Sequence, residues 1–208
     1  MNAEQILASD EFRRCVAFHG HVCPGLSMGY RAAKVAMERL KETRAEDEEL
    51  VAIVETDACS ADAVQVLTGC TFGKGNFLFR DYGKMALTLL SRGTGRGVRV
   101  ALRAGVFAPD KRHMALLQKV ADGAADDREA KEFGELHLRR SRELLEMPEE
   151  ELFAVEPVQM VLPARAAIEP SEPCARCGEP TMRSKLETYK GQRVCRGCKA
   201  VDMSFAEL

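Results

Sequence analysis

The sequence has no long apolar run and almost no net charge, and each absence excludes a class of protein. No stretch approaches the roughly 18 consecutive apolar residues that a membrane-spanning helix needs, and the first residues, MNAEQILASDEFRR, include acids and no apolar core of a secretory signal. Lys and Arg number 30 against 32 Asp and Glu, so no global basic field attracts nucleic acid or an anionic membrane. We therefore expect a cytoplasmic protein that does not contact a membrane.

The eight cysteines fall into two groups with different spacing. In a reducing cytosol such a set favours metal ligation and thiol chemistry over disulfides, although a single buried cysteine is often just a small apolar side chain. Two CxxC pairs lie near the end of the chain and four cysteines are scattered through its first third: Cys174, Cys177, Cys195 and Cys198, and Cys15, Cys23, Cys59 and Cys70. We interpret the pairs as structural, Cys15 as a core residue and the other three as candidates for a reactive site.

Hydrophobic spacing predicts an α+β core, a linker and a small second domain. Expected helices cover residues 9–18, 24–40, 60–67, 113–120 and 126–147, and expected strands cover 50–56, 77–79, 85–90, 98–102 and 152–162. The run LVAIVET at 50–56 is almost wholly apolar, which is typical of a strand covered on both faces. Three glycines between 93 and 97 predict a hairpin. The proline-rich stretch PARAAIEPSEP marks the linker, so we expect domains at 1–165 and 166–208.

The second domain carries the most specific metal motif in the chain. The pair Cys174 and Cys177 is followed, after seventeen residues, by Cys195 and Cys198, which is the spacing of a four-cysteine zinc site. Tetrahedral zinc takes four sulfur ligands at about 2.3 Å, and each CxxC turn provides two. About 40 residues with few aromatics build only a small core, so zinc would supply the folding energy. We expect a structural zinc finger here.

The charge of this domain leaves its partner open. Residues 169–208 contain seven Lys or Arg and six Asp or Glu, and Glu187 is the single acid among six basic residues between 183 and 199. Nucleic acid is one candidate ligand for such a surface. The small net charge fits a zinc-stabilised docking module for a protein or a neighbouring subunit better, so nucleic acid is not the expected partner.

The segment HGHVCPG at 19–25 is the first half of a candidate core site. Pro24 suits the first position of a helix, which places Cys23 at the N-cap. The partial positive charge of the helix end would lower the pKa of that thiol and favour metal ligation or nucleophilic attack. His19, His21 and Cys23 alternate, so an extended segment would direct all three to one side. A histidine that merely caps a helix or lies in the core is an equal alternative for so short a cluster.

The second half of the candidate site is the segment from 54 to 76, where polar side chains flank a helix after a buried strand. The expected N-cap is Ser60, which gives Cys59 an electropositive setting like that of Cys23. Asp62 and Gln65 lie three residues apart on one face of the helix, where they suit the orientation of a ligand or substrate. Asp57 precedes the helix and Cys70 follows it.

A glycine-rich loop with one cation, Gly73-Lys74-Gly75-Asn76, closes this segment. Its backbone amides and the lysine suit a carboxylate or phosphate. It is not a Walker A loop, because Gly69 and Gly73 enclose three residues and Gly75 replaces the Ser or Thr that binds magnesium. A plain glycine turn with an exposed lysine is the alternative.

Two stretches, FHGHVCPGLSMGYRAA at 18–33 and residues 55–76 followed by FRDYGK, resemble the FmdE family, the E component of formylmethanofuran dehydrogenase. The cysteine tail resembles the treble-clef zinc finger that some members append. The resemblance implies an α+β core that forms a homodimer, with both motifs at a cleft that can bind a metal ion. By position it makes His19, His21, Cys23, Cys59 and Cys70 candidate metal or redox residues, surrounded by Asp57, Asp62, Gln65 and Lys74. Among them, His21 and Cys59 are the foremost expected ligands.

Three functions are compatible with these motifs. The first is an enzyme or oxidoreductase component that acts on a small C1 or carbonyl substrate through a core metal, expected to be zinc, or a reactive cysteine; its catalytic residues would be Cys59, Cys23, Asp62 and Lys74. The second is an accessory protein that handles a metal ion, molybdate or tungstate for a partner oxidoreductase. A metal sensor that binds nucleic acid ranks last. The chain shows no iron–sulfur spacing and no pterin signature, so such cofactors would belong to partner subunits.

Overall fold

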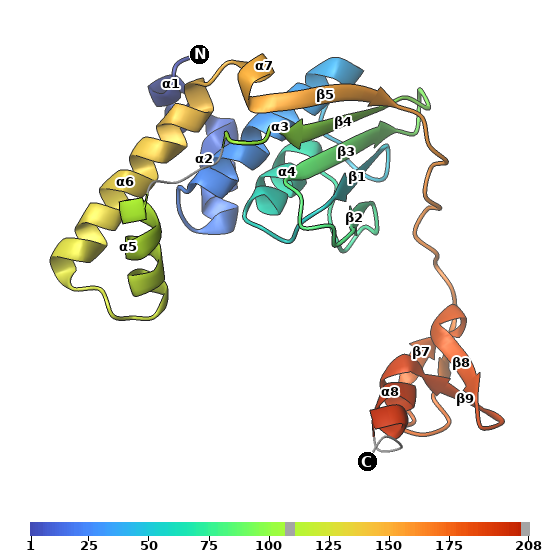
Figure 1. Ribbon diagram of the computed structural model, residues 1–208. Helices are drawn as coiled ribbons and strands as arrows, with labels where there is room; N and C mark the ends of the chain where they lie inside the picture. Colours follow the sequence, from blue (N-terminus) through green and yellow to red (C-terminus); the bar gives the residue numbers. More distant parts are fainter. Residues whose placement is uncertain (107–110, 205–208) are drawn as a thin grey trace. The chain divides into compact units, whose positions relative to one another are not determined.

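The computed structural model describes residues 1–106 and 111–204, with side chains described up to residue 201, and the chain divides into two compact units, 1–165 and 166–208. The first unit contains a five-stranded sheet in the order β2-β1-β3-β4-β5 (Figure 1). Its strands are β1 (Leu50–Val54), β2 (Phe77–Phe79), β3 (Ala86–Ser91), β4 (Gly97–Leu102) and β5 (Phe153–Val158). Only the β1–β2 pair is parallel, and the β3–β4 pair is the antiparallel hairpin that the glycines predict.

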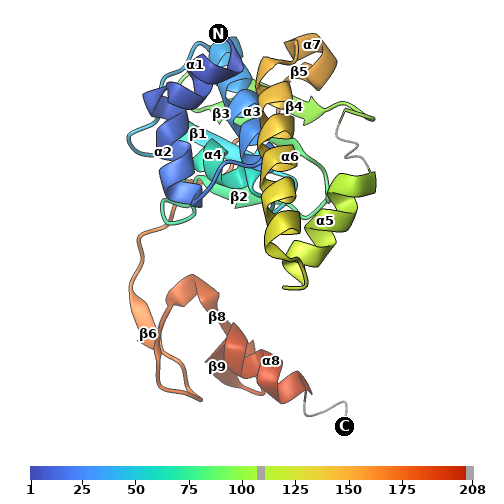
Figure 2. The same ribbon diagram turned by 90° about the vertical axis from the view of Figure 1, so that its left-hand side faces the viewer.

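Helices cover one face of this sheet, with α3 at the centre of the layer (Figures 1 and 2). The helices of this unit are α1 (Ala3–Ala8), α2 (Asp10–His19), α3 (Pro24–Leu40), α4 (Ser60–Thr68), α5 (Lys111–Ala121), α6 (Asp127–Glu146) and α7 (Glu149–Leu152). Most of α3 is buried, because its small and apolar side chains meet the sheet on one side and other helices on the other. Within the described part of the chain, no helix combines the length and the apolar character needed to cross a membrane.

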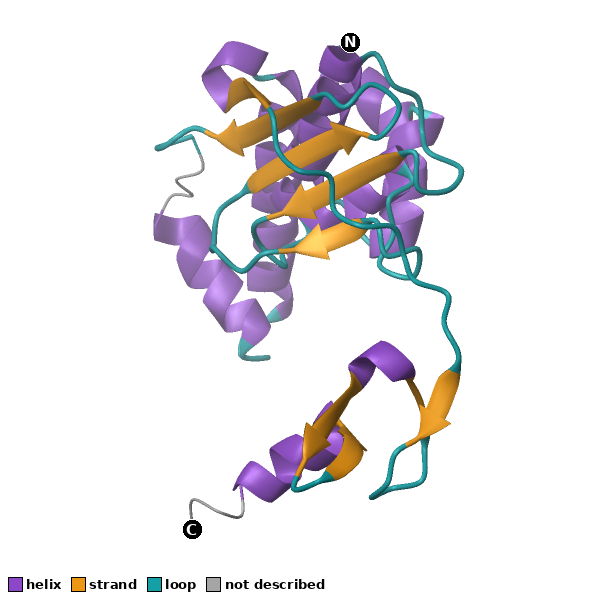
Figure 3. Ribbon diagram, turned by 90° about the vertical axis from the view of Figure 1, so that its right-hand side faces the viewer, coloured by secondary structure: helices purple, strands orange, loops and turns teal. Residues whose placement is uncertain are grey.

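The second face of the sheet has a smaller apolar cluster. Val51, Ile53 and Leu90 are buried there, and Leu162 from the segment after β5 packs against them. Figure 3 shows this segment running across the strands, and the guanidinium of Arg92 fixes it by donating to the carbonyl of Pro163 at 2.8 Å. All five residues of β1 are therefore buried, which confirms the prediction of a strand covered on both faces.

In the first unit every predicted helix and strand is present, but the sequence pattern missed two short helices and extended two strands too far, β1 to 56 instead of 54 and β5 to 162 instead of 158. The first turn of α1 is held by a capping box between Asn2 and Gln5, and six residues are too few to show a helical period. Helix α7 follows Pro148 directly. The last strand ends at Val158 rather than at 162, and Pro157 is tolerated because β5 is an edge strand.

One pair of helices extends this unit beyond the sheet. Helices α5 and α6 pack against each other as a hairpin that reaches past the strands (Figures 1 and 2).

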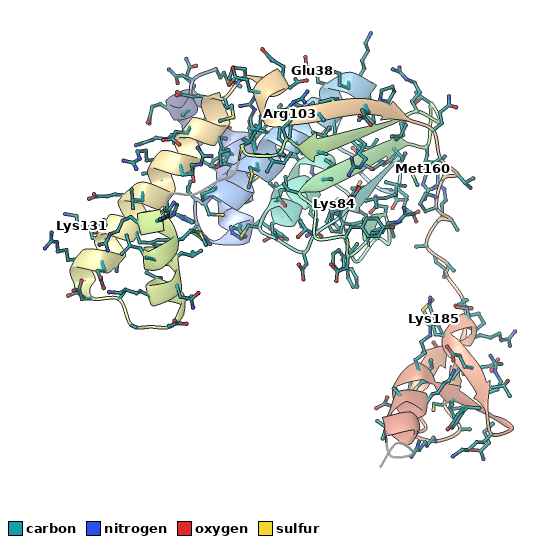
Figure 4. All side chains as sticks on the ribbon, viewed as in Figure 1. Glu38, Lys84, Arg103, Lys131, Met160 and Lys185 are labelled. Carbon is teal, nitrogen blue, oxygen red and sulfur yellow. The ribbon has the colours of Figure 1, made fainter. Side chains whose placement is uncertain are left out.

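The end of β4 is tied to α7 and β5 by one side chain. Arg103, labelled in Figure 4, donates to the carbonyls of Glu150 and Phe153 at 2.8 and 3.1 Å.

The second unit is built from two short antiparallel ribbons and a final helix. Its elements are β6 (Ser171–Pro173), β7 (Pro180–Met182), the 3-10 turn η1 (Arg183–Lys185), β8 (Leu186–Tyr189), β9 (Gln192–Cys195) and α8 (Arg196–Ser204). Its apolar core consists of Leu186 and Val194 packed with cysteine side chains. So small a core leaves the unit dependent on a further stabilising element.

Candidate metal centres

Three candidate ligands of the core site meet where α2 passes into α3. His19 is the last residue of α2, and Gly20 ends that helix in the left-handed conformation, with φ of 105°. One ligand atom each from His19, His21 and Cys23 then lies within 4.8 Å of the other two. The expectation that all three would lie along one extended segment is wrong, because His19 is helical. The left-handed turn at Gly20 brings the three side chains together instead.

The imidazole of His19 is held between a carboxylate and a sulfur. Its Nδ1 lies 2.7 Å from Oδ2 of Asp62 on α4, and its Nε2 lies 3.6 Å from Sγ of Cys23. An ionised carboxylate only accepts hydrogen bonds, so it assigns the proton to Nδ1 and leaves the Nε2 lone pair toward the sulfur. This carboxylate–imidazole arrangement is the one that orients a metal-binding histidine.

Cys23 occupies the N-cap of α3, as the sequence predicts, and its Sγ accepts the backbone N–H of Leu26 at 3.2 Å. The predicted fall in its pKa is wrong for the metal-free chain. Burial raises the pKa of the Cys23 thiol to about 12, and the nearby Cys59 adds to this, outweighing the hydrogen bond at the helix end. A thiol so placed becomes an anion when a cation binds it, which favours a role as a ligand over that of a free nucleophile.

Close contact between α3 and α4 places Cys59 next to Cys23. A β-carbon at Gly29 would lie 2.2 Å from the carbonyl oxygen of Ser60, and one at Gly25 would lie 2.9 Å from Cβ of Cys59. Both sulfurs flank Gly25, at 3.6 Å for Cys59 and 3.9 Å for Cys23 from the same β-carbon position. Only glycine at both positions lets the helices approach this closely. The GxxxG spacing of these two residues is the signal that could have predicted the contact.

Cys59 lies beside the three-residue cluster and is only partly buried. It is itself the N-cap of α4 and makes no side-chain capping bond, so the prediction of Ser60 as N-cap is wrong by one residue. Among the described residues, the mutually close set contains His19, His21 and Cys23. Cys59 therefore borders that set as a reachable thiol.

The remaining predicted residues lie on α4 or on the loops at its two ends. Lys74 donates to the carbonyls of Glu46 and Asp47 at 3.1 Å each, beyond the far end of α4, a helix about 13 Å long. The side-chain oxygen of Gln65 accepts the backbone N–H of Phe72 at 3.3 Å. Asp57 is exposed on the loop before α4, while Cys70 is fully buried after it, and burial raises the pKa of its thiol. Lys74 and Gln65 are thus held by backbone groups near them, and the close set of described ligand side chains includes neither Asp57 nor Cys70.

The structure adds two histidines that the sequence analysis did not select. Nε2 of His113 on α5 lies 3.0 Å from Nδ1 of His137 on α6. Burial, followed by the charges of His113 and His21, lowers the pKa of His137 to about 4. His21 of the core site is thus near enough to affect this pair. Each predicted helix contains only one of these histidines, and no motif links the two. Only their contact across the α5–α6 hairpin reveals the pair.

The four cysteines of the second unit converge, with one sulfur from each lying within 4.8 Å of the others. Backbone N–H groups, foremost that of Cys177, lower the pKa of Cys174 to about 6, whereas a hydrogen bond with Cys195 and burial raise the pKa of Cys198 to about 12. The Cys174 thiolate is therefore stabilised by amides while the neighbouring Cys198 retains its proton. A bound cation would stabilise all four sulfurs as thiolates, so the donor set fits the four-sulfur coordination of zinc.

Four basic residues of this unit pair with only two carboxylates. Arg183 and Arg193 pair with Glu172 at 2.6 and 2.7 Å, and Arg196 and Lys199 pair with Glu187 at 3.0 and 2.6 Å. Lys185, labelled in Figure 4, is exposed. Each of the two carboxylates thus faces two cations, and the choice between a protein and a nucleic-acid partner stays a prediction.

Comparisons with known proteins connect the core to one family. A family model described as "FmdE, Molybdenum formylmethanofuran dehydrogenase operon" matches residues 18–154. A curated protein of Archaeoglobus fulgidus, named "Probable S-adenosyl-L-methionine-binding protein", is 37% identical over 183 residues, which are 84% of this chain and 49% of that protein. The chain thus spans about half the length of that relative.

A solved structure extends the similarity to nearly the whole chain. The crystal structure of a tungsten formylmethanofuran dehydrogenase FmdE-like protein from Syntrophus aciditrophicus aligns with a TM-score of 0.61 and 26% identity. The alignment covers 96% of this chain and 92% of that one. The similarity therefore includes the cysteine-rich unit as well as the core.

Proposed function

The chain belongs to the FmdE family, and we propose that its core site binds one divalent metal ion through His19, His21 and Cys23. The observation that carries the proposal is the position of His19, whose Nδ1 faces Asp62 and whose Nε2 faces Cys23. A carboxylate that holds one ring nitrogen fixes the tautomer and leaves the other nitrogen able to bind a metal, as in carboxylate–histidine–zinc sites. Mixed nitrogen and sulfur donors suit zinc or another late transition metal.

The arrangement supports a centre with an open position. Three protein ligands leave room for one small ligand, and a metal held in this way polarises a carbonyl oxygen or makes a bound water more acidic. His21 is exposed and Cys59 is partly exposed, so a small molecule can approach from solvent on this side. We propose a small C1 or carbonyl compound as the substrate, with Cys59 at the edge of the site as a reactive thiol.

The family description and the Syntrophus aciditrophicus protein support a role within or beside an oxidoreductase. The alternative is an accessory protein that handles a metal ion for such an enzyme. The exposure of His21 favours this alternative, since an ion bound partly by an exposed side chain exchanges readily. Turnover of a carbonyl substrate supports the first role, whereas metal transfer to a chelator without turnover supports the second.

The metal content of the full-length chain tests the proposal. We expect anaerobically purified wild type to contain a core metal in addition to that of the four-cysteine site, and His19→Ala and Cys23→Ser each to lose one equivalent by mass spectrometry. Asp57→Asn, a change at an exposed position before α4, is the matched control. Equal metal content in wild type, His19→Ala and Cys23→Ser would overturn the proposal. Cys59→Ser separates the two roles of Cys59, because retention of the metal excludes it as a required ligand.

Two further expectations remain predictions. The homodimer is implied by the family resemblance, and light scattering of the purified chain measures it directly.

The role of Lys74 in binding an oxyanion is tested by molybdate titration of wild type against Lys74→Gln. Its two hydrogen bonds to the loop at 46–47 predict that this variant loses stability whether or not an anion binds.

A further inference from the structure

The four histidines of the chain all belong to the first unit and form two close pairs. The rings of His19 and His21 have centroids 4.6 Å apart, and those of His113 and His137 have centroids 5.3 Å apart. Four separate segments contribute them: the end of α2, the following loop, α5 and α6. The second pair belongs to neither the core ligand set nor the cysteine site.

The second pair brings ring nitrogens from two helices into hydrogen-bonding distance. The nearest ring nitrogens are 3.0 Å apart and the rings are perpendicular, at 88°. Two nitrogens bound at about 2.1 Å to one ion, with an angle of about 90–110° between the bonds, lie roughly 3.0–3.4 Å apart. The separation of the pair therefore suits one ion when each ring turns from its neighbour toward a common point.

The surroundings of the pair restrict the two rings. His113 is only 6% exposed and is one of two buried residues of α5, the other being Leu116. Phe133 packs beside both rings, with centroids 4.6 Å from His137 and 5.7 Å from His113. These are positions at which a helical hairpin ordinarily places apolar side chains, which pack there without the cost of burying polar nitrogens.

We propose that His113 and His137 form a second, exchangeable binding position for a divalent late transition-metal ion, on the α5–α6 hairpin next to the core site. Neutral imidazoles prefer zinc, nickel, copper and similar ions over magnesium or calcium. With two protein ligands, water or a small ligand completes the coordination, so the ion exchanges faster than in the four-cysteine site. The charge of His21 acts on His137, so His137 lies within electrostatic reach of the core site.

A cobalt titration of the full-length, metal-free chain under anaerobic conditions tests this position. Co²⁺ bound by cysteine in the tail or core shows sulfur-to-metal charge transfer in the near ultraviolet, whereas Co²⁺ bound by imidazoles alone shows only weak visible bands. We expect wild type to bind one equivalent more than His113→Gln/His137→Gln. The near-ultraviolet amplitude is expected to be the same in both proteins.

The outcomes separate this position from the proposed core site. Loss of charge-transfer amplitude in His19→Ala reports the core, while the extra equivalent without such amplitude reports the hairpin. Equal cobalt stoichiometry in wild type and the double variant would show that the two histidines form a hydrogen bond only, and would overturn the inference.

Folding of the hairpin is controlled in two ways. Leu117→Ala changes a side chain of α5 that is 39% exposed and is expected to retain the extra equivalent. In wild type, the ring nitrogen signals of His113 and His137 are expected to shift when Zn²⁺ is added beyond the amount that fills the other sites. Unshifted signals would contradict the inference without any substitution.

Discussion

Nδ1 of His19 and Oδ2 of Asp62 lie 2.7 Å apart, although the two residues are separated by 43 positions in the chain. This contact joins the end of α2 to the first turn of α4 and fixes which nitrogen of the imidazole faces Cys23. The site thus depends on how two helices pack as much as on the motif that contains the histidine.

Asp62→Asn is expected to lower the affinity of the core site for Zn²⁺ by about 10–100-fold, because the amide no longer fixes the tautomer or adds basicity to His19. Competition with a fluorescent zinc chelator measures this affinity. The exposed Asp57→Asn is the control and is expected to bind as wild type does. Equal affinity in the two variants would show that Asp62 does not orient the ligand.

Gly29→Ala is expected to destabilise the chain by about 1–3 kcal/mol or more, since the new methyl group would lie 2.2 Å from the backbone of Ser60 and force α3 and α4 apart. Urea denaturation measures the loss. Gly134→Ala on α6 is the matched control, because nothing lies within 4 Å of the position of its β-carbon. It is expected to stabilise α6 by up to about 1 kcal/mol. A neutral Gly29→Ala would disprove the tight contact.

Thiol labelling of the metal-free chain is expected to follow burial. Cys177 is exposed and Cys59 is partly exposed, whereas Cys23 is 3% exposed and burial raises its pKa to about 12. Iodoacetamide at neutral pH, followed by peptide mass mapping, should therefore modify Cys59 and Cys177 well before Cys23. Added zinc is expected to slow labelling of Cys177. Labelling of Cys23 as fast as Cys59 would contradict the burial of Cys23.

The pair of Glu55 and Arg99 is expected to make stability depend on pH in the acidic range. The guanidinium donates to both carboxylate oxygens at 2.8 and 3.0 Å, which lowers the pKa of Glu55 below its ordinary 4.5. The folded state then binds fewer protons, so this stabilisation is complete above pH 4.5 and is lost as the pH falls through the lower folded-state pKa.

Thermal denaturation of Glu55→Gln between pH 3 and 7 checks this sign. The variant is expected to be less stable than wild type at pH 7, with a difference that narrows as the pH falls. Glu38→Gln, at an exposed position labelled in Figure 4, is the control and should follow wild type throughout. A difference that grows toward low pH would contradict the assignment.

Removal of the tail metal is expected to unfold the second unit while the first remains folded. The apolar core of the second unit is little more than Leu186 and Val194. Without a metal to hold the four sulfurs together, this core buries too little apolar surface to keep the unit folded. Limited trypsin digestion with and without a strong chelator, followed by mass mapping, should show new cleavage between residues 176 and 199. Cys177→Ser should behave as the chelated chain does. Equal protection with and without chelator would exclude a structural metal there.

The sequence predicted the secondary structure well wherever one local signal dominated. Cys23 and Pro24 mark the start of α3, Asp126 caps α6, and glycines form the turn between β3 and β4. Distant interactions lay outside what it could predict. The pKa of Cys23 depends on burial by other elements, and Lys74 turns to the carbonyls at 46–47, which no spacing rule reveals.

By itself the sequence determined the four-cysteine site, because two CxxC turns need only fold toward each other, and it selected His19, His21 and Cys23, because they lie within five residues. Only the tertiary structure decided which groups face them. Asp62 reaches His19, and His113 reaches His137, through the packing of separate helices. Such contacts follow from the volume and shape of buried side chains across the whole core, which spacing along the chain does not encode.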